Sequence, residues 1–300
     1  MHHLAFVTPR KLPKAKDLVG RVVVLDVAFA SEAGGAGFEK TTLPFIDGLG
    51  QRLRAWVDHH DSAHHARYAD DPRFILATKA QHGACPEMVT PELVARVGDI
   101  ETIACHNDFD GLVSAAKWIR KGVECYPGCD DDARAVDTRI GEVGPLGVRF
   151  DRALRARPRD AGLHGIVVRH LSTGLADPSL WGPVDAAARE LIPVEEETRR
   201  LAGGFSILDP GVAYVDATER RGAYDKTLLL LLGQERAKVS VVTDHDTVSV
   251  AAAFDSGLNF LTMFGLSGGM PTRVSLERSR LDGILEALGV SASDRRAKNL

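Results

Sequence analysis

The stretch IETIACHNDFDGLVSAAKWIRKG, residues 100–122, changes from one structural pattern to another at its centre. Its first six residues are mostly apolar and include β-branched side chains, which predicts a short buried strand. The apolar run ends in HNDFDG, which carries His106, Asp108 and Asp110. GLVSAAKWIRKG then repeats apolar residues at helical spacing from Val113 to Ile119. A strand, a polar loop and a helix in this order are the building unit of parallel α/β sheets.

Two earlier segments have the same pattern. RVVVLDVAFA (21–30) ends its apolar run at Asp26, and RAWVDHHDS (54–62) ends at Asp58, His59 and His60. TTLPFIDGLGQRLRA (41–55) lies between them, with apolar residues at three- and four-residue steps that suit a crossover helix. Parallel sheets bind ligands at the carboxyl ends of their strands, so we expect the three polar clusters to converge in one crevice.

The remaining chain predicts a second, smaller α/β domain. We place a parallel-sheet, metal-binding domain at 1–172, a helical linker at 173–204 and a C-terminal substrate-binding domain at 205–300. In the last of these, AKVSVVTDHDTVSVAAAF (237–254) predicts two strands joined by a hairpin turn at 244–246. LERSRLDGILEALG (276–289) predicts an amphipathic helix, and SASDRRAKNL (291–300) a frayed tail.

Composition excludes several classes of protein. The chain of 300 residues is 44% hydrophobic and 26% charged, which is typical of a globular protein, and its net charge of −4 offers no long basic track for nucleic acid. No apolar run approaches the roughly 20 residues of a transmembrane helix, and no signal peptide is evident, so we expect a cytoplasmic protein without a membrane partner. Four irregularly spaced cysteines predict reduced, buried thiols (Cys85, Cys105, Cys125 and Cys129).

The polar clusters have the composition of a metal site. In an extended chain, the alternation of His106, Asp108 and Asp110 would place all three side chains on one face, and Gly111 lets the chain turn away. Carboxylates mixed with imidazole suit Mn²⁺ best, and Mg²⁺ or Zn²⁺ less well. Asp26 and the Asp58–His60 group add enough ligands for two ions.

Each element also has a simpler interpretation. Asp26 suits a turn at the end of a strand, HNDFDG a helix cap, and paired histidines an exposed surface. His64 and His65 are interpreted as surface residues of a helix.

These motifs resemble those of the DHH phosphoesterase superfamily. HNDFDGLVSA resembles its first motif, VVVLDV its second and VDHH its third. In the family the first motif normally precedes the other two, whereas here it follows them. A circular permutation of the catalytic domain would explain this order.

The resemblance implies a role for each residue. Asp58 would orient His59, and His60 would face the substrate phosphate. For the fourth motif, Asp137 in AVDTR is the candidate, with Asp132 an alternative and a helix cap a third interpretation. In the second domain, FGLSGGMPTRVS would bind phosphate through Gly268, Gly269 and Arg273. The metal ligands implied are Asp26, His59, His106, Asp108, Asp110 and Asp137.

The function implied is that of a hydrolase using two Mn²⁺ ions, with Mg²⁺ as an alternative, to cleave phosphodiester bonds in short oligonucleotides or dinucleotides. A small phosphorylated substrate fits the lack of long basic or aromatic stretches. A pyrophosphatase or polyphosphatase of the same superfamily, and a non-catalytic metal- or nucleotide-binding protein, are the alternatives. The sequence is also compatible with a homodimer.

Overall fold

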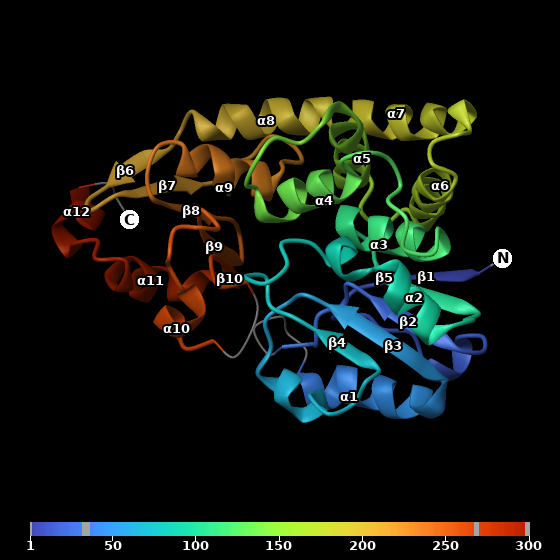
Figure 1. Cartoon of the computed structure of the whole chain (residues 1–300). Coiled ribbons are helices and arrows are strands. Elements are labelled where there is room, and N and C mark those ends of the chain that lie inside the picture. The colour runs from blue at the N-terminus through green and yellow to red at the C-terminus, as the bar shows by residue number, and fades with distance from the viewer. Residues whose placement is uncertain (1, 32–36, 267–269, 298–300) are drawn as a thin grey trace. The chain divides into compact units, whose positions relative to one another are not determined.

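The computed structural model describes residues 2–31, 37–266 and 270–297 of the chain. The chain divides into two compact units, Met1–Leu191 and Ile192–Leu300. Each unit is built on a five-stranded sheet, which confirms the predicted α/β class with a parallel sheet first and a smaller α/β unit second (Figure 1). Within the described residues, no helix combines the length and the apolar character needed to cross a bilayer.

The sheet of unit 1 is parallel throughout and has the order β1-β5-β2-β3-β4. Thus β5, the last of these strands in the sequence, lies between β1 and β2. Because the strands are parallel, the carboxyl ends of β5, β2 and β3 are neighbours at one edge of the sheet. The strands are β1 (His3–Val7), β2 (Val22–Leu25), β3 (Leu53–Asp58), β4 (Phe74–Leu76) and β5 (Thr102–His106).

Helices cover both faces of this sheet, which explains why its central strands are largely apolar. Alternate residues of β2 enter different cores: Val23 and Leu25 join the core on one face, and Val22 and Val24 join the core on the other. The second face packs against α1 (Phe38–Leu49). On the first face, α3 (Phe109–Ile119) and α6 (Ala161–Ser172) contact the strands. The core on this face contains residues of these two helices and of α2 (Pro91–Val97), α4 (Cys129–Thr138), α5 (Pro145–Ala156) and α7 (Trp181–Glu190).

Short 3₁₀ turns complete unit 1. They span Ala15–Asp17, Gly50–Arg52, Ala63–Tyr68, Cys85–Met88 and Pro178–Leu180. The turn at Gly50–Arg52 corrects the crossover helix predicted over 41–55: α1 ends at Leu49, and Leu53 already belongs to β3. Gly50 has a positive φ of 52° that ends the helix, which apolar periodicity does not register. The turn at Ala63–Tyr68 contains His64 and His65.

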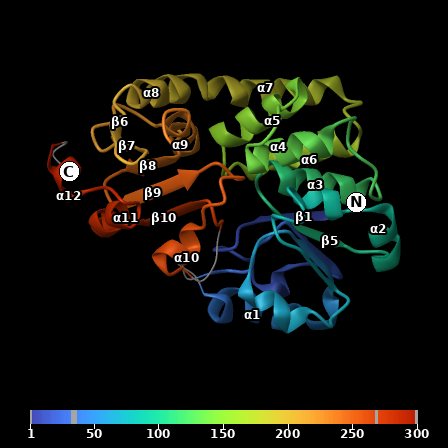
Figure 2. The same cartoon turned by 60° about the vertical axis from the view of Figure 1, so that its left-hand side comes forward.

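Unit 2 has a mixed sheet of order β10-β9-β8-β7-β6, in which only β7 and β8 are parallel. One face packs against α10 and α11, and the other against α8 and α9. Figure 2 shows β8, β9 and β10 side by side. The elements are α8 (Ile192–Ala202), β6 (Ser206–Leu208), β7 (Val212–Asp216), α9 (Lys226–Gln234), β8 (Val239–Thr243), β9 (Thr247–Ala252), α10 (Phe260–Phe264), β10 (Arg273–Glu277), α11 (Leu281–Ala287) and α12 (Ala292–Ala297), with a 3₁₀ turn at Arg278–Arg280.

The hairpin predicted at 244–246 is confirmed, since β8 and β9 pair antiparallel and the amide of Asp244 donates to the carbonyl of Thr247. Two predictions for unit 2 were wrong. The helix expected over 276–289 starts only at Leu281, because Arg273–Glu277 pair with β9 as β10. Part of the expected tail forms α12. All four cysteines are free and buried, as predicted.

Candidate metal centre

Asp26 follows β2 in an unusual conformation. Its φ is +59°, in the left-handed region that residues other than glycine adopt uncommonly and at a cost, although aspartate and asparagine adopt it more often than most. Its amide donates to the carbonyl of Val57 at 2.8 Å, which holds the residue against β3. The residue is 1% exposed, and neither carboxylate oxygen has a hydrogen-bond partner. A buried carboxylate in this state is costly, so the surroundings must supply a reason for it.

His59 lies directly after β3 and is fully buried. Its Nδ1 is 2.9 Å from the carbonyl oxygen of His82, and because a carbonyl can only accept, Nδ1 carries the hydrogen. Its Nε2 is 3.2 Å from Oδ1 of Asp26 and 3.4 Å from Oδ2 of Asp110, yet makes no hydrogen bond. The ring is therefore anchored through one nitrogen, and the other nitrogen faces two carboxylates.

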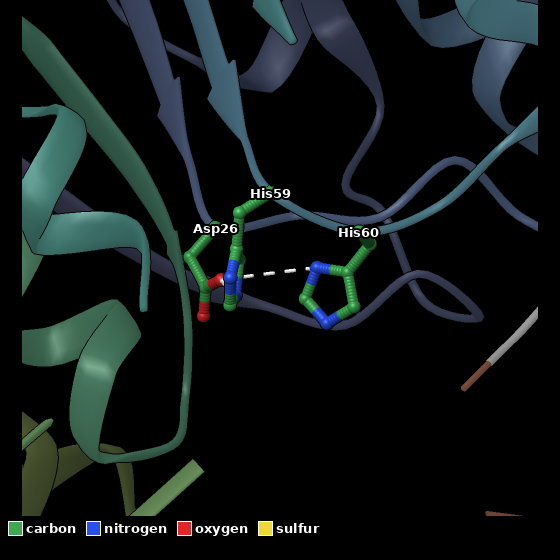
Figure 3. A group of neighbouring side chains, drawn as sticks. All are labelled: Asp26, His59 and His60. Carbon is green, nitrogen blue, oxygen red and sulfur yellow. Dashed lines mark ion pairs between the residues drawn. The ribbon is translucent and has the colours of Figure 1, made fainter. Parts of the chain in front are cut away.

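His60 is held by the neighbouring aspartate. Oδ1 of Asp58 accepts from Nδ1 of His60 at 2.9 Å. Asp58 therefore pairs with His60, whereas the resemblance implies that it orients His59. The same Nδ1 is 3.9 Å from Oδ1 of Asp26. In Figure 3 the rings of His59 and His60 lie beside the carboxylate of Asp26. The side chain of His60 is 27% exposed, whereas that of Asp58 is buried, so only the histidine reaches solvent.

The alternation of the first-motif residues predicts that they share one extended strand. That prediction was wrong. The strand β5 ends at His106, Asp108 is the N-cap of α3, and Asp110 lies in its first turn. Nδ1 of His106 is 2.6 Å from Oδ2 of Asp108 and 3.7 Å from Oδ2 of Asp26. Gly111 permits this sharp entry into the helix, because a Cβ there would lie 2.6 Å from the carbonyl oxygen of His106.

The two candidates for the fourth motif differ in their surroundings. Oδ2 of Asp137, in α4, is 3.9 Å from Nε2 of His59 and forms an ion pair with Lys79. Asp132 instead accepts hydrogen bonds from the hydroxyl of Tyr126 and from the amides of Gly144 and Gly147. The structure therefore brings Asp137 to the cluster, and Asp132 joins α4 to the segment that enters α5.

Three groups of side chains have the spacing that a metal ion requires. In each group, one ligand atom from every member lies within 4.8 Å of the others. Asp26 belongs to two groups: its Oδ1 faces His59 and His60, and its Oδ2 faces His106. His59 also belongs to two. The groups are Asp26, His59 and His60; Asp26, His106 and Asp108; and His59, Asp110 and Asp137.

These residues fit divalent cations. The atoms without hydrogen-bond partners include both carboxylate oxygens of Asp26, Nε2 of His59 and Nδ1 of His106, and all of them face other ligand atoms of the cluster. Carboxylate oxygen and imidazole nitrogen suit ions on the hard-to-borderline side, such as Mn²⁺, Mg²⁺ and Zn²⁺. A pair of cations would give each of these buried atoms a partner.

Without cations, the cluster has an excess of negative charge, and the pKa values of its side chains are shifted as a result. Burial, together with the charges of Asp110 and Asp108, raises the pKa of Asp26 to about 6. Burial opposes the protonation of His59, but the carboxylates of Asp110 and Asp26 outweigh it and raise its pKa to about 11. Burial likewise opposes the protonation of His106, but Asp108 raises its pKa well above the ordinary value. Protonated His59 and His106 would offset part of this negative charge at neutral pH. Metal binding requires neutral imidazole and would release those protons.

The predicted phosphate-binding residues belong to unit 2. Gly268 and Gly269 lie outside the described residues. Arg273 begins β10, and its guanidinium donates to the hydroxyl of Thr227 at 2.9 Å.

Sequence reasoning did not find Lys79 or His82. Both lie in the loop ATKAQHGAC (77–85) that follows β4, and the sequence contains no spacing that relates this loop to the three motifs. Lys79 is 4% exposed. Burial disfavours its charge, but Asp137, with Asp110 and Asp26, outweighs burial and raises its pKa. A lysine and a histidine within six residues of the end of β4 were the only available signal.

Comparison with known proteins does not assign the chain to a family. No protein-family model matches the chain, and no curated protein matches it. One matching solved structure is described as the pGpG-specific phosphodiesterase PggH from Vibrio cholerae, with 15% identity and a TM-score of 0.35. The match covers 48% of this chain and 56% of the other, so this chain spans about half of its neighbour's length. A likeness at this level assigns neither family nor activity.

Proposed function

We propose that the chain is a two-metal phosphoesterase that hydrolyses phosphodiester bonds in short oligonucleotides or dinucleotides. The observation that carries the proposal is the conformation and burial of Asp26, together with the lack of hydrogen bonds to its carboxylate. Its backbone is in a strained conformation, its carboxylate is buried, and its two oxygens face separate groups of ligands without a hydrogen bond. Strain and unsatisfied polar groups of this kind persist in folded proteins mainly at functional sites.

The side chains divide into two sets around Asp26. His106 and Asp108 would hold one ion with Oδ2 of Asp26, and His59, Asp110 and Asp137 would hold the other beside Oδ1. When bound, such a pair of ions lowers the pKa of a bound water and stabilises negative charge on the phosphoryl oxygens. Mn²⁺ is the ion proposed, because the set mixes imidazole with carboxylate.

His60 is the chain's own candidate for contact with the substrate. Because the carboxylate of Asp58 can only accept, Nδ1 of His60 carries the hydrogen of their bond, and this fixes the orientation of the ring. Burial opposes ionisation of Asp58, but His60 outweighs it and lowers the pKa of the carboxyl. Nε2 of the partly exposed ring is then free to face the substrate. In the imidazolium form, Nε2 also carries a hydrogen, which it could donate to a phosphoryl oxygen or transfer to the leaving group.

Charge supports a small substrate. Without cations, the aspartates of the cluster would repel a phosphate, so the ions must supply the local attraction. The net charge of the chain is −4, and no long basic segment could follow an extended nucleic-acid strand.

The test is hydrolysis of a 5′-phosphorylated dinucleotide by metal-stripped protein, with and without Mn²⁺. Mononucleotide release should require Mn²⁺ and should fall by at least about 10- to 100-fold in His59→Ala, since loss of a residue that only supports a metal ligand typically costs that much. His64→Ala is the matched control, because His64 is exposed and stacks on Phe38 outside the cluster. Its activity should equal that of the unmodified protein.

Two outcomes would contradict the proposal in different ways. Mn²⁺-dependent release of phosphate from pyrophosphate, with no cleavage of the dinucleotide, would replace the substrate class by that of a pyrophosphatase. Binding of Mn²⁺ without hydrolysis of either compound would support a non-catalytic metal-binding protein.

A further inference from the structure

Lys79 is a buried cation beside the candidate metal ligands, next to the group formed by His59, Asp110 and Asp137. It follows β4 in the loop that also supplies the carbonyl of His82, and it is 4% exposed. Its ammonium forms an ion pair with Oδ2 of Asp137 in α4. A buried lysine is costly unless a carboxylate pairs with it, so this contact holds the ammonium in place.

The carboxylate oxygen that Lys79 contacts is also the one nearest to His59. Oδ2 of Asp137 is 3.9 Å from Nε2 of His59, and that nitrogen is 3.4 Å from Oδ2 of Asp110. An ion bound by His59, Asp110 and Asp137 would therefore share a ligand oxygen with the ammonium group. The other half of the cluster differs: among the described residues, no lysine or arginine forms an ion pair with Asp26, His106 or Asp108.

We infer that Lys79 makes the two metal positions unequal, so that the Asp26, His106 and Asp108 position binds its ion tightly and the His59, Asp110 and Asp137 position binds its ion weakly. The inference rests on the proposed function, since it presumes two ions. Its physical basis is competition for Asp137 and repulsion between the ammonium and a divalent cation in a buried, weakly screened environment. One ion would then be resident, and the second would exchange with the free metal around the protein.

The experiment is a titration of metal-stripped protein with Mn²⁺, in which bound and free ion are measured by equilibrium dialysis or by the electron paramagnetic resonance of free Mn²⁺. The unmodified protein should show two classes of site. Lys79→Met, which keeps the length of the side chain and removes its charge, should raise the affinity of the weaker class by about tenfold or more. Lys79→Arg keeps the charge, so the difference in Mn²⁺ affinity between the two classes of site should stay the same.

Lys117→Met is the matched control. Lys117 is also a buried lysine of unit 1, 7% exposed, but its ammonium pairs with Asp130 and donates to the carbonyl of Pro86, away from the cluster. Its replacement should change neither class of Mn²⁺ site. Asp137→Asn provides a second, independent variant, and it should weaken only the weaker class.

Each outcome decides the matter. Unchanged or lower affinity of the weaker class in Lys79→Met would overturn the inference, and so would loss of the tighter class in Asp137→Asn. If Lys79→Met does not fold, as judged by tryptophan fluorescence, Lys79→Gln and Asp137→Asn carry the test. If the unmodified protein binds no Mn²⁺, the metal centre itself is wrong, whereas two classes that ignore Lys79 would refute only the present inference.

Discussion

Replacing Asp26 by asparagine should stabilise the metal-free protein. The pKa of this carboxyl is raised from 3.8 to about 6, and a difference of that size disfavours the charged form by about 3 kcal/mol at neutral pH. Asparagine has nearly the same shape and tolerates the positive φ of this position. Its buried amide would still lack partners, at a cost of about 1–2 kcal/mol. The net gain should be about 1–2 kcal/mol.

Tryptophan fluorescence is a suitable measurement, because all three tryptophans (Trp56, Trp118 and Trp181) belong to unit 1. In a unit of this size, the expected gain raises the melting temperature by about 2–8 °C. Mn²⁺ should reverse the order of the two proteins. At about 100 times its dissociation constant, a ligand stabilises the folded state by about 2.7 kcal/mol, and the asparagine variant should lose most of that gain.

Asp132→Asn is the matched contrast, since this buried carboxylate accepts three hydrogen bonds, one from a tyrosine hydroxyl and two from backbone amides. The same chemical change should therefore destabilise unit 1 by about 1–3 kcal/mol. A metal-free Asp26→Asn protein that melts below the unmodified protein, as Asp132→Asn should, would refute the view that Asp26 is strained and unpaired without cations.

Three further measurements follow from the structure. Burial lowers the pKa of His170, whose ring packs against Trp181 without a hydrogen-bond partner. As pH falls below about 6.5, the unfolded chain therefore takes up a proton that the folded chain does not, and stability falls. The fall should be shallower in His170→Phe, as measured by urea denaturation at several pH values. Phe260→Ala should cost unit 2 about 3–5 kcal/mol by circular dichroism, because Phe260 is fully buried in its core. Chelation of metal from protein purified with Mn²⁺ should lower the melting temperature reported by the tryptophans, and Mn²⁺ should restore it.

Local pattern was sufficient to predict the strands that end at the cluster and the helix that follows the third of them. The strands are largely apolar because helices cover both faces of their sheet; they are Val22–Leu25, Leu53–Asp58 and Thr102–His106. The prediction was less successful where one residue decides the ending of an element, as at Gly50, or where a strand is short and half-buried, as in Phe74–Leu76.

Sequence could not predict how the side chains of the cluster pair. Asp58 and His59 are adjacent in the chain, yet successive residues at the end of a strand point in different directions, so Asp58 reaches His60 and the carbonyl of His82 reaches His59. Lys79 was missed for a related reason, because its partner is 58 positions away and only the packing of α4 brings them together. The ligand assignments of the motifs stay predictions until metal binding is measured.

The position of β5 between β1 and β2 has a consequence for synthesis of the protein. During translation, residues 3–7 have no strand to pair with until residue 106 has left the ribosome, and until then β2 presents one unpaired edge. The first hundred residues therefore emerge as an incomplete sheet, with both β1 and the edge of β2 open to incorrect pairing. A chaperone that binds nascent chains would be needed most in this interval. The candidate metal centre cannot form before the interval ends, because His106, Asp108, Asp110 and Asp137 have not yet been released.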